Sequence, residues 1–425
     1  MKKIIIILVV VFMSMSLVSC DTKSKNSSVE EIKGKVNIWT TDANEALIND
    51  AMVLFKKKYP HVYVNISTLA EDKLEDNLSN SLKEKVNLPD IVVVRDKNVP
   101  VIINKFEGSF LDASSISQFN KDIFIKNQIN NNTYKNKVYA VPLYVEPTFM
   151  LYREDILGGL NIKSEDIKTW QQYIDIGVNP VKSNGKLMLS SDYFNNGAIY
   201  DLALRQLGVS YFNKDKKIDL LNEKAVKAAD LLNNIYNSKI SQDDKESTDK
   251  IQSFVRGDTV SLLCNLSTMY NIQNKYPDLS GKLKAQKIPA FEQGGNRDNI
   301  NFGDNLMLLK TSENNSAALE FTKFLSSNEE LSAYEYTRYG FMSSNINSYS
   351  DDSFYKKNIF YNNENIGRMA IDEILGLRNM QYSYNFNIIR NKVLQTIIDT
   401  SINGKPLNDS LYNLQTSLEQ TDELK

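Results

Sequence analysis

Hydrophobic and polar residues follow two different spacings in the first part of the chain. Residues 35–40 and 62–66 alternate between apolar and polar side chains, which is typical of β-strands. From Leu47 to Tyr59 an apolar residue recurs at every fourth position, which indicates a helix, and Pro60 ends it. The pattern therefore predicts a strand, a helix and a second strand.

A further helix and strand follow. Leu74, Leu78 and Leu82 lie on one face of a predicted helix, and residues 89–94 include an unbroken apolar run typical of a buried strand. Because strand and helix units repeat, the pattern predicts a parallel sheet within an α/β fold.

Two prolines, Pro142 and Pro147, frame an extended apolar stretch within residues 138–147. Proline lacks a backbone N–H, so it is disfavoured inside helices and central strands. We therefore expect this stretch to be a boundary or a crossover between two parts of the fold.

Helical spacing dominates the next part of the chain, which predicts a helix-rich second domain. Thr169 is the expected cap of a helix that begins at Trp170. Helical periodicity continues to about Ile240, and residues 241–250 are expected to be a charged surface stretch. The later predicted elements are a helix that ends near 254–258, strands at 259–265 and 301–309, and helices at 266–274, 317–325 and 385–402.

The first residues have the order of an export signal. Two lysines precede an apolar run from Ile4 to Met13, and Leu17-Val18-Ser19-Cys20 is a small-residue cleavage site that ends in cysteine. The apolar run is shorter than the roughly 20 residues that span a bilayer. We therefore expect residues 1–19 to be a signal peptide and the polar residues 20–33 a flexible tether.

The ending Leu-Val-Ser-Cys resembles the bacterial lipobox, in which the chain is cut before the cysteine and the thiol is acylated. The resemblance implies a lipoprotein that a fatty acid such as palmitate on Cys20 anchors to the cell membrane. The mature chain would then lie on the extracellular face of that membrane.

Length and charge limit the classes of function. The mature chain of about 400 residues is too long for one ordinary core, so we expect two domains. Its 50 basic residues nearly balance its 52 acidic residues, which gives no electrostatic basis for binding nucleic acid. Cys264 lies in an apolar run and is expected to be a buried thiol without a disulfide partner.

Several kinds of catalytic and metal chemistry lack the residues they need. The single histidine, His61, lies in a predicted surface turn, which argues against serine or cysteine triads and against metal sites built on several histidines. No phosphate-binding glycine motif occurs, so we expect no nucleotide-driven work and no cofactor. Two carboxylates acting on a glycosidic bond need no fixed spacing, so a surface glycosidase stays open as an alternative.

A series of short segments occurs in the order found in a known family. They are residues 35–40, 88–91, 138–155, 169–170, 254–265 and 317–325. Together they cover nearly the whole mature chain, which resembles the extracellular solute-binding lipoproteins of sugar-type ABC importers, the family of the maltose-binding protein.

The resemblance implies a two-lobed α/β fold of the type II periplasmic-binding-protein kind, with discontinuous lobes joined by a hinge. Residues 34–141 and 302–345 would form the first lobe, and residues 146–300 and 346–425 the second. Lobes that close about a hinge trap a ligand between them. The resemblance further implies a monomer without enzymatic activity that captures a mono- or oligosaccharide and delivers it to the permease subunits of the importer.

A sugar site combines aromatic rings with polar groups that bond to hydroxyls, and such residues are expected where strands end at the cleft. Thr41 and Asp42 follow the first strand, although Asp42 also opens a D-x-x-E sequence typical of a helix cap. Arg95 and Asp96 follow the third strand and are candidates for holding hydroxyls, with an exposed ion pair as the alternative.

The resemblance adds candidates from later in the chain. Glu146 lies where the maltose-binding protein has a ligand-binding glutamate, and Tyr144 precedes it in the proline-framed stretch. The family commonly has a sugar-stacking tryptophan where this chain has Ser267, and Tyr270 is a candidate replacement with a core role as its alternative. Other family cleft positions correspond to Asp304 and Tyr384.

The acidic candidates leave a second kind of ligand open. A polyamine site needs several acidic groups in the cleft, and Asp42, Asp96, Glu146 and Asp304 would supply them. The same fold with a polyamine as ligand is therefore an alternative to sugar binding.

Overall fold

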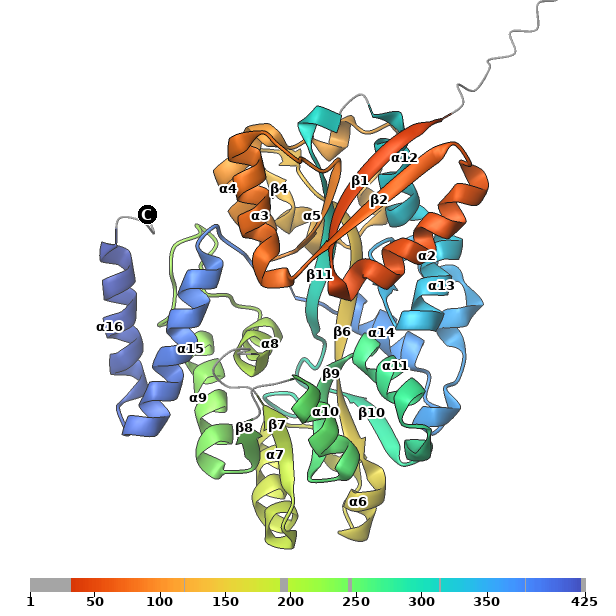
Figure 1. Ribbon diagram of the computed structural model, residues 1–425. Coiled ribbons are helices and arrows are strands. Elements are labelled where there is room, and N and C mark those ends of the chain that lie inside the picture. The colour runs from red at the N-terminus through yellow and green to blue at the C-terminus, as the bar shows by residue number, and fades with distance from the viewer. Residues whose placement is uncertain are drawn as a thin grey trace, which may run out of the picture.

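The computed structural model describes residues 32–421 apart from 118, 192–197, 244–246, 313–314 and 379. Cys20, the predicted signal peptide and most of the predicted tether lie outside the described residues. The molecule has two halves, one above the other in Figure 1, and strands run through both of them. Within the described ranges, no helix is both long enough and apolar enough to cross a membrane.

The strands that build the main sheet come from distant parts of the chain. They are β1 (Gly34–Thr41), β2 (Val62–Leu69), β3 (Ile91–Arg95), β6 (Val141–Arg153), β7 (Leu187–Ser191), β8 (Ser241–Asp243), β9 (Thr259–Asn265), β10 (Leu283–Lys287), β11 (Ile300–Leu308) and β12 (Met342–Ser343). Their order is β2-β1-β3-β11-β6-β9-β7-β8, with β10 and β12 also paired to β6. A separate hairpin consists of β4 (Thr133–Tyr134) and β5 (Lys137–Val138).

The sheet is mixed, so the expectation of a parallel sheet is wrong at its centre. β1 is parallel to β2 and β3, as the alternating strand and helix units predict. β11 is antiparallel to both β3 and β6, and β6 is antiparallel to β9. The reason is that β11 enters the first half from the second half of the molecule and therefore runs against its neighbours.

Helices cover both faces of the sheet in each half (Figure 1). In the first half they are α2 (Asp42–Lys58), α3 (Glu71–Glu84), α4 (Val99–Phe106), α5 (Lys126–Asn131), α12 (Ser316–Ser327) and α13 (Glu329–Tyr339). In the second half they are α6 (Glu154–Gly159), α7 (Trp170–Ile176), α8 (Ala198–Leu207), α9 (Glu223–Ser238), α10 (Ser247–Arg256), α11 (Leu266–Lys275), α14 (Ile366–Leu375), α15 (Phe386–Asn403) and α16 (Leu407–Gln420).

Two helix starts test the sequence signals directly. The Thr169 hydroxyl accepts a hydrogen bond from the Gln172 N–H at 3.2 Å, and the Gln172 side chain bonds back, so the predicted cap of α7 is confirmed. At α2 the cap position is Thr41 and no side-chain cap bond forms there. The interpretation of Asp42 as a capping residue is therefore wrong, because the helix already begins at Asp42.

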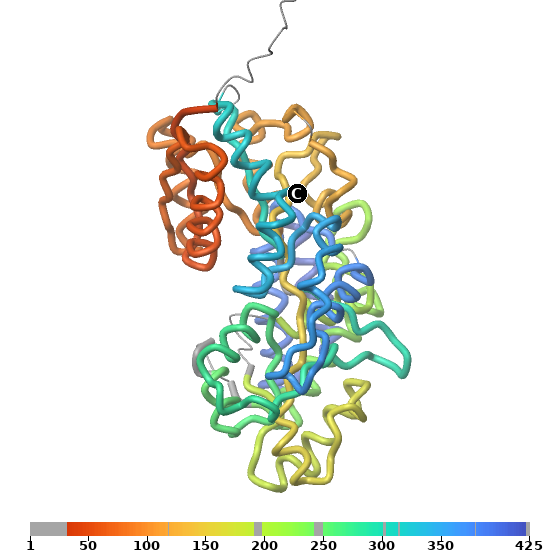
Figure 2. The backbone as a smooth tube through the Cα atoms, turned by 90° about the vertical axis from the view of Figure 1, so that its right-hand side faces the viewer, coloured from red at the N-terminus to blue at the C-terminus, as the bar shows by residue number. Residues whose placement is uncertain are grey.

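The proline-framed stretch lies in β6, and all 13 residues of this strand are buried. The expectation that it avoids a central strand is therefore wrong. The register between β6 and β11 shifts beside both Pro142 and Pro147, which removes ladder bonds that proline cannot make. The expected crossover is confirmed, since β6 pairs with β11 and then with β9 and β10 as it runs from one half to the other (Figures 1 and 2).

Apolar cores lie on both faces of the sheet in the first half. Alternate residues of β3 supply both, because Ile91 and Val93 pack under α2 and α12 while Val92 and Val94 pack under α3 and α4. The rings of Phe55 on α2 and Phe321 on α12 meet with their centres 4.9 Å apart. The fully apolar run predicted for this strand is thus explained by burial on both sides.

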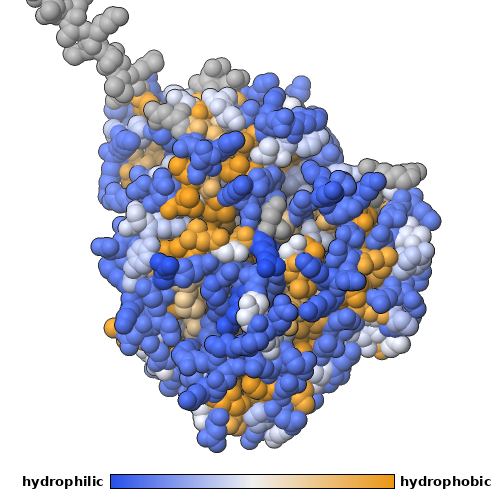
Figure 3. All heavy atoms as spheres, turned by 180° about the vertical axis from the view of Figure 1, so that it is seen from behind, coloured by the Kyte–Doolittle hydropathy of each residue, from blue (hydrophilic) through white to orange (hydrophobic). Residues whose placement is uncertain are grey.

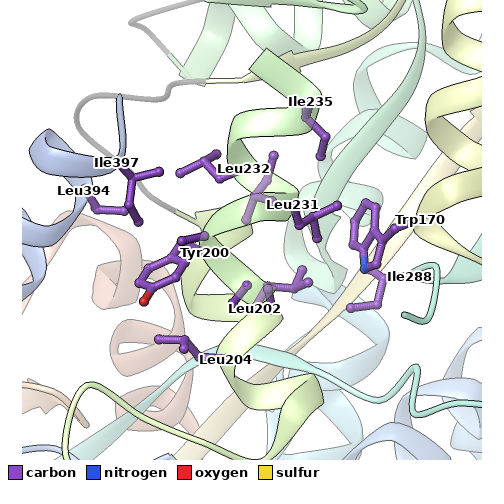
Figure 4. Packing of buried hydrophobic residues seen from close by; sticks show 14 of the residues in the cluster. Trp170, Tyr200, Leu202, Leu204, Leu231, Leu232, Ile235, Ile288, Leu394 and Ile397 are labelled. Atoms are coloured by element: carbon purple, nitrogen blue, oxygen red, sulfur yellow. The ribbon is translucent and has the colours of Figure 1, made fainter. Parts of the chain in front are cut away.

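The largest core of the second half fixes the position of α8. Tyr200 and Leu202 on α8 pack against Leu232 on α9 and Ile397 on α15 (Figure 4). One strand beside this core, β7, was predicted as helix, because a short apolar run has no period of its own to distinguish the two. On the face shown in Figure 3 hydrophilic residues predominate and hydrophobic residues gather in separate patches.

Candidate functional site

A cavity of about 720 Å³ lies where the two halves meet, and we call it the Glu146 cavity. Its size is within the range of roughly 300–1,000 Å³ that is usual for small-molecule sites. The walls come from α2, α3, β3, β6, α11 and the end of α13. The lining residues are Ala43, Ala46, Glu71, Arg95, Tyr144, Glu146, Asn265, Ser267, Thr268, Tyr270, Asn271, Asn274, Arg338, Tyr339 and Phe341.

Glu146 is placed by the alternation of β6. Side chains two residues apart in a strand lie on one face, so Tyr144 and Glu146 both line the cavity while Val145 enters an apolar core. The carboxylate is only 2% exposed and accepts hydrogen bonds from the Asn265 side-chain amide and from the Ser267 hydroxyl, the latter at 2.5 Å. Each carboxylate oxygen therefore has a neutral partner.

The orientation of the Asn265 amide follows from its place at the start of α11. Its Oδ1 accepts the N–H of Thr268 at 3.0 Å and so caps the helix. The Nδ2 group must consequently point toward Glu146. A helix cap and a cavity contact are thus combined in one side chain.

Burial sets the protonation of Glu146. Removal from water raises its pKa from 4.5 to about 7, and the nearby Asp304 adds to the rise, while Ser267, Arg95 and Asn265 act in the opposite direction. The group is therefore poised between a carboxylate that accepts hydrogen bonds and an acid that donates one.

A buried polar cluster supports the cavity floor. The Tyr144 hydroxyl lies 2.7 Å from Asp304 Oδ2 and 2.5 Å from Asn44 Oδ1, and Asn44 donates to the same Asp304 oxygen at 2.7 Å. Burial raises the pKa of Tyr144 well above 10, and the Asp304 charge adds to this, so the hydroxyl stays protonated. Asp304 Oδ1 is buried and has no hydrogen-bond partner among the described residues.

Asp96 belongs to the same interior region. It accepts hydrogen bonds from Asn305 at 2.7 Å and from Gln128 at 3.3 Å, and burial raises its pKa to about 6. Gly303 makes this packing possible, because a Cβ atom there would lie 2.8 Å from the Tyr144 carbonyl oxygen and 2.9 Å from Asp96 Oδ2. Asp96 is therefore held behind the cavity wall and does not line it.

Aromatic side chains form one side of the cavity. Phe341 packs on Tyr144 with ring centres 4.4 Å apart, and Tyr339 and Tyr270 lie in the same wall. Gly340 ends α13 with a positive φ of 77°, and a Cβ atom there would lie 2.8 Å from the Leu266 carbonyl oxygen. This glycine lets the aromatic segment approach the start of α11.

Both arginines of the cavity lie in ion pairs. Arg95 pairs with Glu71 at 2.7 Å, and Arg338, which is 56% exposed, pairs with Asp50 at 3.2 Å. Two cations and two carboxyl groups, Glu71 and Glu146, thus face the cavity. Its net charge is close to zero.

The ten predicted ligand-binding residues fall into three groups. Arg95, Tyr144, Glu146, Ser267 and Tyr270 line the Glu146 cavity. Thr41, Asp96 and Asp304 are buried and do not line it. Asp42 is exposed at the start of α2, and Tyr384 lines a different cavity of about 650 Å³ together with Tyr134 and Asn385.

The sequence interpretation missed most of the α11 and α13 contributions. Thr268, Asn271 and Asn274 recur every third residue, a helical polar stripe that could have indicated a wet face. No local signal marks Arg338, Tyr339 and Phe341, because they reach the cavity only through the packing of α13 on the second half. Cys264 is buried as predicted, and burial raises its pKa. In the part of the chain that is described, no group of three or more His, Cys, Asp or Glu residues is placed to hold a metal ion.

The chain is similar in sequence to known solute-binding proteins. The chain is 25% identical over 402 residues to the lactose-binding protein of Rhizobium radiobacter, covering 91% of this chain and 93% of that one. It is 26% identical over 337 residues to the arabinooligosaccharide-binding protein of Bacillus subtilis (strain 168), covering 78% of each chain.

Solved structures with less sequence identity share the fold. An ABC substrate-binding protein from Listeria monocytogenes in complex with cycloalternan has a TM-score of 0.75 at 18% identity, covering 92% of this chain and all of that one. The galacto-N-biose-/lacto-N-biose I-binding protein of Bifidobacterium longum has a TM-score of 0.76 at 15% identity, covering 92% and 98%. The two-lobed α/β fold expected from the sequence is confirmed by these structures. A model of the bacterial extracellular solute-binding protein family matches residues 50–360, and the chain belongs to this family.

Proposed function

We propose that this protein captures a carbohydrate in the Glu146 cavity as the solute-binding component of an ABC importer. The observation that carries the proposal is the combination of a nearly neutral polar cavity with one aromatic wall. Glu146, Asn265 and Ser267 supply groups for sugar hydroxyls, and Tyr270, Tyr339 and Phe341 supply ring surface. The named ligands of its relatives, lactose and arabino-oligosaccharides, support a sugar of at least two units.

The aromatic wall can replace the sugar-stacking tryptophan that the family commonly has where this chain has Ser267. Tyr339 is the last residue of α13, Phe341 follows it closely, and Tyr270 comes from α11. A sugar ring stacks on such faces while its hydroxyls bond at the edges. A carbohydrate can therefore be held without the usual tryptophan.

The charge of the cavity favours a sugar over a polyamine. Of the four acidic residues that kept a polyamine open, only Glu146 lines the cavity. Asp96 and Asp304 are bonded to neutral side chains in the interior, and Asp42 is exposed elsewhere. Arg95 and Arg338 offset the charges of Glu71 and Glu146, so the cavity has no excess negative charge to attract a polycation.

Binding rather than hydrolysis is the proposed activity. Both oxygens of Glu146 are held by Asn265 and Ser267, whereas a glycosidase needs one carboxyl group free to protonate the leaving oxygen and a second facing it. The relatives named above are likewise binding proteins. The sugar would be trapped when the two lobes close on each other about β6 and β11. One lobe consists of residues 34–141 and 302–345, and the other of residues 146–300 and 346–425. The closed form would then dock on the permease.

We further propose that a lipid on Cys20 holds this monomer at the extracellular face of the cell membrane. The support is the basic, apolar and Leu-Val-Ser-Cys order of residues 2–20. Expression in a bacterium with labelled palmitate tests it. The label should appear in the mature protein and be absent from Cys20→Ala, and an unlabelled, uncut chain would refute the anchor.

Thermal unfolding with a ligand panel tests the function. Lactose, arabino-oligosaccharides, other disaccharides and spermidine are added to the purified chain from Lys33 onward. A ligand at 100 times its Kd stabilises the folded state by about 2.7 kcal/mol, so the right sugar should raise the Tm clearly. If spermidine raises the Tm and no sugar does, sugar binding is refuted. If the protein releases monosaccharide from an oligosaccharide, it is an enzyme and the proposal of binding without hydrolysis is wrong.

A further inference from the structure

A second, smaller cavity adjoins the Glu146 cavity. It has a volume of about 80 Å³ and we call it the Arg205 recess. Its lining residues are Thr148, Ala198, Leu202, Arg205, Leu263, Cys264, Asn265 and Asn299. Asn265 lines both cavities, so the recess lies beside the group that holds Glu146. The recess has room for a substituent of a sugar but not for a sugar ring.

Arg205 is a buried cation that has no carboxylate partner among the described residues. The residue is 7% exposed, and α8 is fixed by the core shown in Figure 4. Its guanidinium donates to the Tyr382 hydroxyl at 3.0 Å, and no carboxylate of the described residues lies within ion-pair distance. A guanidinium has five N–H donors, so most of them have no acceptor among the described residues. Buried charges in proteins are normally paired, which marks Arg205 as unusual.

The nearby acidic groups are already engaged elsewhere. Asp201 pairs with Arg390 at 2.7 Å and accepts the Tyr211 hydroxyl at 2.6 Å, and Asp96 is bonded to Asn305 and Gln128. Burial lowers the pKa of Arg205, but Tyr382 and Asp201 outweigh this effect and the pKa is raised. The side chain is therefore charged.

Two further polar atoms of the recess lack a hydrogen-bond partner in the described part of the chain. Thr148 Oγ1 and Asn299 Oδ1 are buried and form no hydrogen bond with any described residue. Asn299 Nδ2 donates to the Leu202 carbonyl oxygen at 2.9 Å, which orients the amide with Oδ1 as the unused atom. Leu202 and Leu263 supply apolar walls, and low polarity strengthens electrostatic contacts made beside them.

We propose that the Arg205 recess binds the carboxylate of an acidic sugar whose ring lies in the Glu146 cavity. A carboxylate matches the planar fork of a guanidinium with two parallel hydrogen bonds and neutralises its charge. The Thr148 hydroxyl is placed as a further donor, and Asn299 Oδ1 accepts from a neighbouring sugar hydroxyl. A neutral hydroxymethyl group would fill the same space and leave the charge unpaired. This inference rests on the proposed function and specifies a uronic acid unit within its substrate class.

Isothermal titration of the unaltered protein tests the proposal with matched pairs of sugars. Digalacturonate and glucuronic-acid-containing disaccharides are each compared with the same compound after reduction of the carboxylate to a hydroxymethyl group. A charged hydrogen-bonded contact accounts for about a 10- to 150-fold difference in affinity, and we expect the best-binding acid to exceed its reduced form by that factor. Equal affinities, or tighter binding of the reduced form, would overturn the proposal.

Two variants assign the preference to Arg205. Arg205→Gln should lower the affinity for the acid to that of its reduced form and leave binding of the reduced form within about twofold. Arg368→Gln is the matched control, because this arginine is 57% exposed on α14 and lies in neither cavity. If Arg205→Gln retains the full preference for the acid, the assignment is wrong.

The outcomes separate this inference from the proposed function. Neutral sugars that bind with no gain from a carboxylate overturn the acidic-sugar inference alone. Absence of binding by every acidic and neutral sugar overturns both. The preference for the acid is measured on the unaltered protein, so the acidic-sugar inference can be tested even if Arg205→Gln does not fold.

Discussion

Replacement of Glu146 by glutamine should make the stability of the protein less dependent on pH. The folded state raises the pKa of this carboxyl from 4.5 to about 7, chiefly because it is buried. Folding therefore favours the protonated form. The stability that the group contributes is complete below pH 4.5, declines as the pH rises toward 7, and changes little above that value.

The magnitude follows from the two pKa values. They differ by about 2.5, and a difference of one corresponds to 1.36 kcal/mol, so ionisation of Glu146 lowers the free energy of unfolding by about 3 kcal/mol between pH 4 and pH 8. Glutamine does not titrate. Its oxygen can accept from Asn265, its NH₂ group can donate to Ser267, and Ser267 can donate to Asn265 Oδ1 at 3.2 Å instead. The hydrogen bonds of the site can therefore be kept.

Urea unfolding at several pH values from 4 to 8 measures this effect. The free energy of unfolding of Glu146→Gln minus that of the unaltered protein should increase by about 3 kcal/mol across the range. Asp96 titrates in the same window but is present in both proteins, so its contribution cancels. Glu292→Gln, on an exposed loop, controls for the loss of one carboxylate. If the difference in unfolding free energy between the two proteins stays constant within about 0.5 kcal/mol from pH 4 to pH 8, the reasoning is refuted.

Three further substitutions test packing, hydrogen bonding and helix capping by urea unfolding. Gly303→Ala should destabilise the protein by about 1–3 kcal/mol, because its Cβ would press on the Tyr144 carbonyl oxygen. Gly108→Ala is the control and should not destabilise it, because no atom lies within 4 Å of the added Cβ. Equal losses of stability in the two variants would contradict this reasoning. Tyr144→Phe should cost about 1–3 kcal/mol by leaving Asn44 Oδ1 without its donor, and an unchanged stability would show that this bond contributes nothing. Thr169→Ala should cost about 0.5–2 kcal/mol through loss of the α7 cap, and the exposed Thr337→Ala on α13 is its control; similar losses in the two would argue against the cap.

Local patterns predicted most elements correctly because their causes are local. Alternation predicted β1 and β2, fourth-residue spacing predicted α2 and α3, and a capping box predicted the start of α7. The errors occur where long-range contacts decide. β6 tolerates two prolines only because the register of β11 shifts beside them, and β11 lies more than 150 residues further along the chain.

The candidate site shows the same division. Glu146, Tyr144, Ser267, Tyr270 and Arg95 were predicted from strand ends and family resemblance, and all five line one cavity. Asp96 and Asp304 have the same local signals but are turned into the interior, where amide groups hold them. Whether a polar residue after a strand faces a cavity or the interior depends on neighbours that the local sequence does not specify.

The sequence by itself determined the α/β class, the crossover and the identity of the glutamate in the cavity, because each depends on short spacings or on an ordered series of motifs. Only the tertiary structure decided that the sheet is mixed, that Tyr339 and Phe341 belong to an aromatic wall, and that Arg205 is buried with no carboxylate partner among the described residues. These features arise from contacts between residues that lie far apart in the chain. Burial and charge pairing are properties of that assembled environment, so no local pattern predicts them.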